Sequence, residues 1–383
     1  MKARTVVPIS VLAGFVPAGR IRSSLRILLP VLTLCSAMAT WSQDSGHMPG
    51  PTVSLKKGPE ALLKAQSAPE FSNILSARQR IQRARESAGN AAAAPRRMAT
   101  AQAAAQYSFV SINIPNSAFV QPNAINNVGL VVGYYADENY NNHGFLWQNG
   151  TVQTIDYPGA LSTSLTGIND WGVMIGAYQD ENYNTYTVTY SLANSAWTVL
   201  PNLPGGLQEV FGIAGINDEG LAVGCAGGFL GPQSWIWHPD SQSYSYFTAP
   251  AASEATTCGQ IINNFGSVVG SMSIVYSNSP FLFLGDYGNR YTNFSLPSSL
   301  NSPGLVAPFG INDADTIVGS FFTADYASAS GFILTRGGSF TVFNQPGADQ
   351  TYLTGINDFG VLCGDTYDPS TGQSPGFVAY PRR

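Results

Sequence analysis

Two short stretches of the chain carry the same set of oxygen-bearing and aromatic side chains. Residues 135–141 and 178–184 both follow the pattern Tyr-x-Asp-Glu-Asn-Tyr-Asn. Clustered carboxylate and amide oxygens suit Ca²⁺ without requiring it, and aromatic rings beside amides suit a sugar or a peptide. The spacing lacks a strict metal-loop pattern, so a duplicated, solvated polar loop is the alternative explanation. The predicted ligand-binding residues are Asp137, Glu138, Asn139, Tyr140, Asp180, Glu181, Asn182 and Tyr183.

Side chains suited to catalysis are scarce in the same part of the chain. From residue 107 onward the sequence contains His143 and His238 but no Lys, so a general base or a Schiff-base former has few candidates. No zinc-type Cys/His spacing is present. Nineteen Asp and Glu occur over the same range, which makes some close carboxylate pair inevitable. We predict no catalytic residue, no metal ligand and no required cofactor, while a carboxylate-based carbohydrate hydrolase or lyase stays open.

A second pattern, Ile-Asn-Asp-x-Gly or a close variant, occurs six times. The spacing of its Asn residues ranges from 43 (169 minus 126) to 49 (312 minus 263). An Asn side chain can bond its own backbone two residues on, and the Gly can take a positive φ, which together fit a type I turn with a G1 bulge. Asp315 replaces this Gly in the fifth copy. The predicted structural turn residues are Asn126, Asn169, Asn217, Asn263, Asn312 and Asn357.

Four of these turns also carry an Asp after the Asn, at 170, 218, 313 and 358. Such a set of carboxylates could form a site. However, Asn127 and Asn264 replace the Asp in the other two copies without loss of the pattern. We therefore assign these residues to turn chemistry.

The elements that position these residues follow from the repeat. Each copy predicts a strand before the turn and two or three strands after it, and a period of about 45 residues is typical of propeller blades. The last copy lacks its fourth strand, and residues 109–114 resemble the missing segment. We predict an all-β domain over 107–383, a six-bladed β-propeller of four-stranded antiparallel blades. Its ring would be closed by the N-terminal strand in the last blade, which removes exposed sheet edges.

A Gly also recurs in the second strand of all six copies, and we predict a tight packing point between blades there. These residues are Gly133, Gly176, Gly224, Gly270, Gly319 and Gly364. Because the blades are antiparallel, all Asn-Asp turns lie on one face of the domain, which we call the turn face. The loops between second and third strands lie on the opposite face, which we call the loop face. Because loops carry most binding residues, we place the ligand site on the loop face.

The repeated Ile-Asn-Asp-x-Gly-x-Val-Val-Gly phrase, followed by His-Gly-Phe-Leu-Trp at 143–147, resembles the HAF family of extracellular bacterial repeat proteins. The resemblance covers 107–383. The family's His-Ala-Phe signature is kept in part, since other copies read Ser-Gly-Phe, Pro-Gly-Phe or Ser-Pro-Phe. The resemblance implies an exported repeat architecture and no particular activity.

The first 106 residues differ from the rest in composition. Arginines precede an apolar run over 27–37, and Ala37-Met38-Ala39 fits a cleavage site, so 1–39 is predicted to be a signal peptide. Residues 40–106 form a basic, Ala-rich linker, partly helical or disordered, with nine basic and four acidic residues (+5). The alternative is a basic arm that docks on an acidic partner, a membrane surface or the domain beside it. From 107 onward four Arg face nineteen acids (−15), which would repel nucleic acid.

Three cysteines remain after the signal peptide. Cys225 and Cys258 fall towards the same face of adjacent predicted blades, which is compatible with a disulfide. Three buried thiols, including Cys363, are the alternative.

We predict a secreted, periplasmic or cell-surface protein, a monomer without a transmembrane segment after signal removal. Its predicted role is a binding or interaction module for an extracellular polysaccharide or protein. The alternatives are the carbohydrate-active enzyme above and a structural surface protein.

Overall fold

The computed structural model describes residues 103–203, 208–227, 233–247, 255–274, 281–286, 290–294, 305–322 and 328–382. They lie in the second of two compact units into which the chain divides, Trp41–Arg383. The predicted signal peptide and linker residues 40–102 lie outside the described residues. Within these ranges no helix is both long and apolar enough to cross a membrane. The one short helix described, η1 (Ala103–Gln106), is a 3-10 turn before the first strand.

The described residues form six four-stranded antiparallel sheets. We number them from first to sixth in chain order. The first three sheets comprise β2 (Phe119–Ile125), β3 (Val131–Ala136), β4 (Asn142–Gln148) and β5 (Thr151–Thr154); β6 (Ser162–Ile168), β7 (Val173–Gln179), β8 (Thr185–Ser191) and β9 (Ala196–Val199); and β10 (Gln208–Ile216), β11 (Ala222–Gly227), β12 (Gln233–His238) and β13 (Ser243–Phe247). The fourth, fifth and sixth comprise β14 (Ala255–Ile262), β15 (Ser267–Ile274), β16 (Phe281–Asp286) and β17 (Arg290–Phe294); β18 (Leu305–Ile311), β19 (Ile317–Phe322), β20 (Ala329–Leu334) and β21 (Phe340–Phe343); and β22 (Gln350–Ile356), β23 (Leu362–Tyr367), β24 (Gly376–Pro381) and β1 (Tyr107–Ile112).

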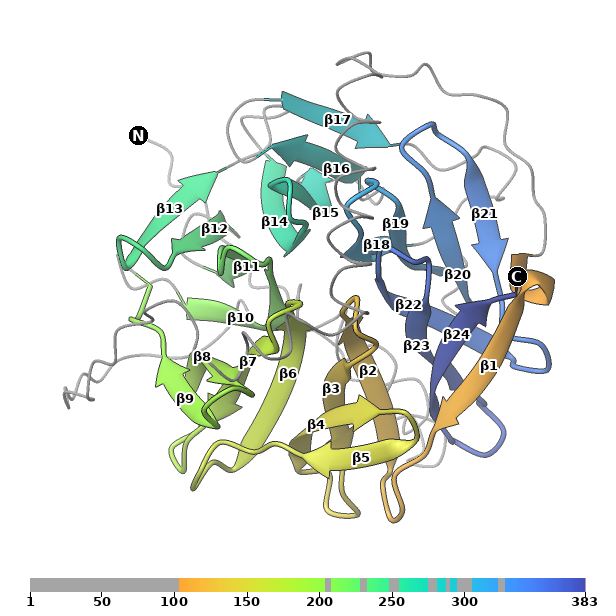
Figure 1. The fold of residues 1–383 in the computed structure, drawn as a ribbon, viewed down its shortest axis with the longest axis horizontal. Coiled ribbons are helices and arrows are strands. Elements are labelled where there is room, and N and C mark those ends of the chain that lie inside the picture. Colours follow the sequence, from red (N-terminus) through yellow and green to blue (C-terminus); the bar gives the residue numbers. More distant parts are fainter. Residues whose placement is uncertain are drawn as a thin grey trace, which may run out of the picture. The chain divides into compact units, whose positions relative to one another are not determined.

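The sheets are arranged as the blades of a β-propeller. In Figure 1 the first strand of each sheet lies nearest a common centre and the last strand lies outermost. Each inner strand contacts the inner strands of neighbouring sheets, and β22 contacts both β18 and β2. β1 pairs antiparallel with β24, from Tyr107 opposite Pro381 to Ile112 opposite Gly376. The N-terminal strand and the three C-terminal strands therefore share one sheet.

The burial pattern of each strand follows its place in the sheet. The third strand β4 is buried on both faces because it lies between neighbouring sheets, as Phe145 to Trp147 illustrate. Outer strands such as β5 and β9 have no fully buried side chains, because one edge of each strand faces away from the sheet. Burial in an outer strand still depends on its residues, since Phe340 and Phe343 of the outer strand β21 are buried.

The hydrophobic core lies between successive sheets. Val132 and Leu146 of the first sheet pack with Leu165 and Met174 of the second. The sixth sheet meets the first in a similar cluster, which joins Cys363 and Val378 to Phe145. Each large side chain buried in this way stabilises the fold by about 1.5–3 kcal/mol.

The Gly of each second strand lies opposite a β-bulge in its own sheet. Gly133 pairs with Pro122, where the register shifts before Ala124, and Gly319 pairs with Pro308 in the same way. A Cβ on Gly133 would overlap the Gln121 carbonyl oxygen, because the bulged strand turns that carbonyl towards the glycine. The prediction that this Gly packs between blades was wrong.

A different Gly occupies the contact between sheets. It is the residue before Ile in four of the six repeated phrases, and Ala124 and Ile261 stand there in the other two. A Cβ on Gly215 would meet the backbone of Ile261 in the next sheet at 2.9 Å, and one on Gly310 would meet Gly355 at 3.0 Å. The inner strands approach closely at these two glycines, so a side chain there would meet the neighbouring backbone.

Candidate functional site

Each Asn-Asp turn is closed by its own Asn. In the first turn the N–H of Gly129 donates to the Asn126 carbonyl (3.1 Å), and Asn126 Oδ1 accepts from the N–H of Leu130 (2.9 Å). Gly129 has φ +83°, and Asp315 holds the equivalent place in the fifth turn with φ +55°. The local hydrogen bonds are those of a tight turn with a left-handed residue.

The same Asn side chains also connect neighbouring sheets. Asn126 Nδ2 donates to the carbonyl of Asn169 in the next turn (3.0 Å), and each following Asn does the same at 3.0–3.2 Å. Asn357 Nδ2 returns to the carbonyl of Asn126 (3.1 Å). All six Asn residues are buried. One side chain therefore closes its own turn and bonds the next sheet.

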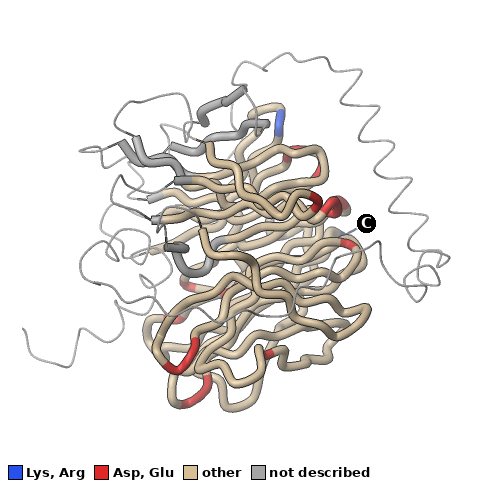
Figure 2. The backbone as a smooth tube through the Cα atoms, turned by 90° about the vertical axis from the view of Figure 1, so that its left-hand side faces the viewer, with Lys and Arg blue, Asp and Glu red and all other residues tan. Residues whose placement is uncertain are grey.

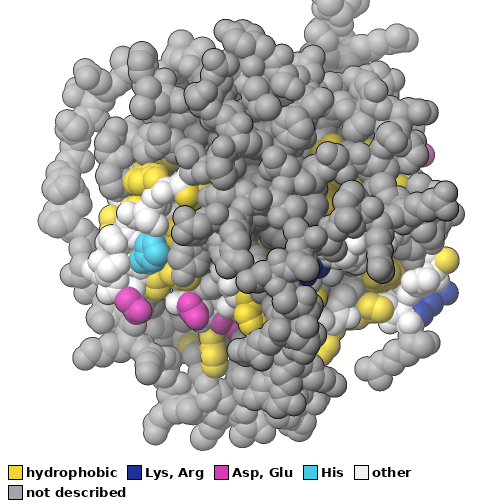
Figure 3. All heavy atoms as spheres, turned by 90° about the horizontal axis from the view of Figure 1, so that it is seen from above, with side chains coloured by type: hydrophobic (Ala, Val, Ile, Leu, Met, Phe, Trp, Pro, Cys, Tyr) yellow, Lys and Arg dark blue, Asp and Glu magenta, His cyan; other side chains and the backbone are white. Residues whose placement is uncertain are grey.

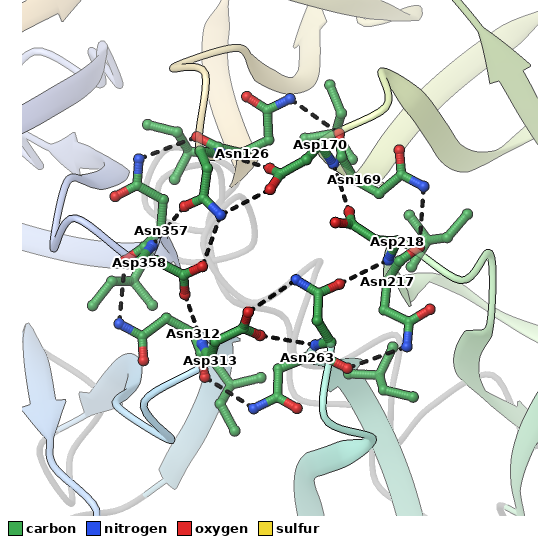
Figure 4. A pocket seen from close by; sticks show the side chains of 18 residues that line it. Asn126, Asn169, Asp170, Asn217, Asp218, Asn263, Asn312, Asp313, Asn357 and Asp358 are labelled. Carbon is green, nitrogen blue, oxygen red and sulfur yellow. Dashed lines mark hydrogen bonds between the residues drawn. The ribbon is translucent and has the colours of Figure 1, made fainter. Parts of the chain in front are cut away.

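The residue after each Asn adds a second cyclic set of bonds, shown in Figure 4. Asn127 N–H donates to Asp170 Oδ1, and Asp170 N–H donates to Asp218 Oδ1, both at 2.8 Å. The set continues through Asn264 and Asp313 and ends where Asp358 N–H donates to Asn127 Oδ1 (2.8 Å). Turn preference alone does not explain these Asp residues, since their carboxylates accept from backbone N–H groups of a neighbouring sheet.

The turns surround a small cavity of about 70 Å³. Two Asp pairs, 170/218 and 313/358, alternate with single Asn residues around it. Asn127 Nδ2 donates to both Asp170 Oδ2 (2.9 Å) and Asp358 Oδ2 (2.7 Å). Burial, followed by the nearby Asp313 carboxylate, raises the pKa of Asp358 to about 7. The amides thus separate two pairs of carboxylates whose mutual repulsion is only partly relieved.

On the loop face, the two duplicated stretches fold into nearly identical loops. Between β3 and β4, Asp137 Oδ1 accepts from the N–H groups of Asn139 and Asn141 at 2.8 Å. Asp180 Oδ1 accepts from Asn182 (2.9 Å) and Asn184 (2.8 Å) between β7 and β8. Each carboxylate therefore holds the backbone of its own loop.

These bonds also keep both carboxyl groups ionised. The backbone N–H of Asn141 is the largest influence that lowers the pKa of Asp137. At Asp180 desolvation acts in the opposite sense, but the bonds from Asn184 and Asn182 outweigh it and the pKa is lowered. Of the eight predicted ligand residues, these two are thus largely occupied by the loops themselves.

The other six predicted residues point to solvent as two equivalent trios, Glu138-Asn139-Tyr140 and Glu181-Asn182-Tyr183. Tyr140 is 50% exposed and Tyr183 is 70% exposed. Both tyrosines have positive φ, 65° and 63°, at the turn position where glycine usually stands. A bulky residue in this conformation is strained by roughly 1–3 kcal/mol. Two exposed aromatic rings are thus held in the same unfavourable backbone conformation.

A row of stacked rings crosses from the first sheet to the second. Tyr157, just beyond β5, stacks on Tyr178 of β7 with centroids 3.8 Å apart and planes 3° apart. Tyr178 stacks in turn on Tyr186 of β8 at 5.1 Å. No sequence pattern predicts this row, because its members come from separate segments and meet only in the folded sheets.

The two loops differ in the residue that faces their Asp. In the first, His143 Nδ1 lies 2.7 Å from Asp156 Oδ2, and its Nε2 lies 3.6 Å from Asp137 Oδ2. In the second, the Tyr186 hydroxyl donates to Asp180 Oδ2 (3.3 Å). Each ring stacks on the Tyr that begins its loop, Tyr135 or Tyr178, at 5.1 Å. An imidazole and a phenol therefore occupy equivalent places.

The remaining candidate residues lie apart from these loops. Cys225 of β11 and Cys258 of β14 are joined by a disulfide between neighbouring sheets, and Cys363 is a buried free thiol. His238 Nε2 lies 2.8 Å from Ser245 Oγ in the third sheet. Within the described ranges no group of three or more His, Cys, Asp or Glu is arranged to hold a metal ion.

One half-buried acid was not singled out from the sequence. Asp365 of β23 accepts a hydrogen bond from Ser374 Oγ (3.3 Å), and burial raises its pKa to about 8. Burial is the main cause of the raised pKa values of Tyr134 and Tyr352, and the nearby Asp365 carboxyl group is the second cause. No sequence pattern marks Asp365, because the other copies have different residues at this place.

No protein-family model matches the sequence, and no curated protein matches it. Solved structures with a similar fold include TolB from Acinetobacter baumannii, at 10% identity and TM-score 0.44, over 66% of this chain and 64% of that one. The Aleuria aurantia lectin is similar at 12% identity and TM-score 0.38 (62% and 80% covered). An oligogalacturonate lyase from Vibrio parahaemolyticus is similar at 9% identity and TM-score 0.41 (72% and 97% covered). These proteins differ in function, so the likeness does not identify a ligand for this chain.

Proposed function

We propose that the chain is an exported binding module that contacts an extracellular polymer through the two duplicated loops. The observation that carries this proposal is the pair of exposed tyrosines, Tyr140 and Tyr183, held with positive φ at the loop tips. Strained and exposed aromatic residues reduce stability and solubility, so their duplication is best explained by contact with a ligand. The adjacent Glu, Asn and Tyr side chains offer hydrogen-bond acceptors, amide donors and flat apolar rings.

The scaffold of this module is inferred to be a closed ring of six blades. Three features support the inference: the pairing of β1 with β24, the contact of β22 with β2, and the hydrogen bonds from Asn357 and Asp358 back to Asn126 and Asn127. A closed ring fixes neighbouring sheets at a constant offset. The two loops would then stand at a fixed separation.

Export through the signal peptide at 1–39 and membership of the HAF family belong to the same proposal. The apolar run with its small-residue cleavage site supports the first. The sixfold phrase supports the second. Ca²⁺ at the loops is a further option, which binding measurements with and without the ion would resolve.

The test is a binding screen of the full secreted chain against glycan and extracellular-protein panels, with and without Ca²⁺. We expect at least one ligand whose affinity falls tenfold or more in the Tyr140→Ala/Tyr183→Ala double variant. Tyr246→Ala is the matched control, because Tyr246 is 39% exposed on the outer strand β13. Unchanged binding in the double variant would refute the proposal. Cleavage of a bound glycan would instead support the hydrolase or lyase alternative.

A further inference from the structure

We propose that the loop surface of the first two sheets selects a glycan chain of repeated units that carries no carboxylate or sulfate groups. This rests on the proposed function and adds the chemical class of its ligand. The observations are the duplicated trios, the ring row between the sheets and the charge of the surface.

The repetition of the trios indicates a repetitive ligand. Glu138-Asn139-Tyr140 and Glu181-Asn182-Tyr183 present the same groups in the same backbone conformation on neighbouring sheets. Two identical subsites recognise the same chemical unit twice, and linkage of those units in one chain strengthens binding without new contacts. A glycan chain has such identical units, whereas a folded protein surface rarely does.

The aromatic residues supply surfaces that suit sugar rings. Tyr140 and Tyr183 expose their rings at the loop tips. The half-buried Tyr157, Tyr178 and Tyr186 stack on one another and support the surface between the two sheets. The C–H face of a pyranose can lie on an aromatic ring, while Asn and Glu side chains bond its hydroxyls.

The charge of this surface disfavours acidic ligands. Glu138 and Glu181 are exposed, and Asp156 follows β5 beside the first loop. Hydrogen bonds hold the pKa values of Asp137 and Asp180 below their usual range, so both stay ionised. Figure 2 shows acidic positions at turns and loop tips of the described chain. Within about 8 Å at physiological salt, such charges repel a polyanion.

No described basic group near the loops compensates for this charge. His143 already lies between Asp156 and Asp137, at 2.7 and 3.6 Å. Arg336, in the fifth sheet, lies 3.4 Å from Asp315. From residue 107 onward the sequence contains no Lys. Figure 3 views the molecule from above Figure 1, where acidic and basic side chains are scattered among the described atoms. Binding of a carboxylated or sulfated chain would need a cationic partner that the described loop surface lacks.

The test is a titration of the full chain with hexasaccharides of glucose, N-acetylglucosamine and galacturonate. We expect an uncharged hexamer to bind at least tenfold more tightly than the galacturonate hexamer, and its disaccharide to bind at least tenfold more weakly. The Glu138→Gln/Glu181→Gln variant should raise galacturonate affinity at least threefold. Glu219→Gln is the control, because Glu219 is equally exposed but lies on a turn of the opposite face.

The failures of the two proposals differ. Galacturonate binding as tight as that of the uncharged hexamers, with loss in Tyr140→Ala/Tyr183→Ala, overturns the charge selection but keeps the loop site. Absence of binding to all three hexamers, with tyrosine-dependent binding of a protein, overturns the glycan inference alone. Binding whose affinity is unchanged in the Tyr140→Ala/Tyr183→Ala variant overturns the proposed function itself.

Discussion

The turn face and the loop face use the same residue types, Asn and Asp, in opposite ways. On the turn face Asn169 and Asp170 are buried, and both bond the next sheet. Asn169 Nδ2 donates to the Asn217 carbonyl, and the Asp170 N–H donates to Asp218 Oδ1. On the loop face Asp137 bonds the backbone of its own loop, and Asn139 is exposed. The first arrangement joins sheets, and the second shapes separate loops.

The difference follows from distance to the centre. The Asn-Asp turns end the innermost strands, which contact one another in consecutive sheets. The duplicated loops join second and third strands, which lie farther out in Figure 1. Sheets diverge with distance from the centre, so side chains of one loop bond within that loop. The same Asn or Asp therefore stabilises the fold at one end and leaves neighbouring groups exposed for a ligand at the other.

The largest expected effect at a single pH is a difference in stability between one substitution on the turn face and one on the loop face. Asn169→Ala removes the bonds to Trp171 N–H, Val173 N–H and Asn217 O, and leaves buried groups without partners. We expect unfolding free energy to fall by about 3 kcal/mol. Asn139→Ala on the loop face should change it by less than about 0.5 kcal/mol. Chemical denaturation measures both, and equal losses would contradict the contrast.

The second prediction concerns pH. Asp358 binds a proton more tightly in the folded state, where its pKa is about 7, than in the unfolded state, where it is near the ordinary 3.8. Protonation of Asp358 therefore stabilises the fold fully below about pH 3.8, and this stabilisation is lost as the pH rises through about 7. Asp358→Asn places an amide where Asn127 and Asn264 already stand in other turns. Its unfolding free energy, relative to the parent, should rise by about 3.5 kcal/mol between pH 4 and pH 7.5.

Chemical denaturation at several pH values measures the difference in unfolding free energy between Asp358→Asn and the parent. Asp137→Asn is the control on the loop face. There the folded pKa is lowered, so the contribution is present above the ordinary value and lost as pH falls through the folded pKa. A constant difference for Asp358→Asn at all pH values would show that its carboxyl does not titrate as inferred.

The third prediction sets strain against binding. Tyr183→Gly removes a bulky residue from φ +63°, and we expect a gain of about 0.5 kcal/mol in stability. The same variant should bind the ligand at least tenfold more weakly. Tyr246→Gly, in the strand β13, should instead destabilise the fold by about 1 kcal/mol. Destabilisation by Tyr183→Gly would mean that the tyrosine supports the fold.

The smallest effect compares the two loops with each other. In the first loop His143 lies 2.7 Å from Asp156 Oδ2 and 3.6 Å from Asp137 Oδ2, whereas in the second loop the Tyr186 hydroxyl donates to Asp180 Oδ2 at 3.3 Å. His143→Tyr copies the second loop and loses the contact with Asp156, so we expect unfolding free energy to fall by about 0.5 kcal/mol. Tyr183→Phe, at the exposed tip of the second loop, is the control and should change it by less than this. Chemical denaturation measures both, and an unchanged stability of His143→Tyr would contradict the role of the Asp156 contact.

Much of the fold could be predicted from local sequence. The Asn-Asp-x-Gly phrase set the positions of the turns, and the segments between phrases became four-stranded antiparallel blades in a propeller arrangement. The pairing of the N-terminal segment with the last sheet followed from its likeness to residues 340–346. The second-strand Gly was misplaced, because a β-bulge is invisible in the spacing of apolar residues.

The candidate site was predictable as a pair of loops but not in its details. The sequence alone determined the sixfold period, the turn chemistry and the duplicated Asp-Glu-Asn-Tyr stretch, since each depends on residues close together in the chain. Only the tertiary structure decided that Asn126 bonds Asn169, that Asp358 titrates near neutral pH and that Tyr157 stacks on Tyr178. Those contacts join residues from different repeats, and only the folded sheets bring them within bonding distance.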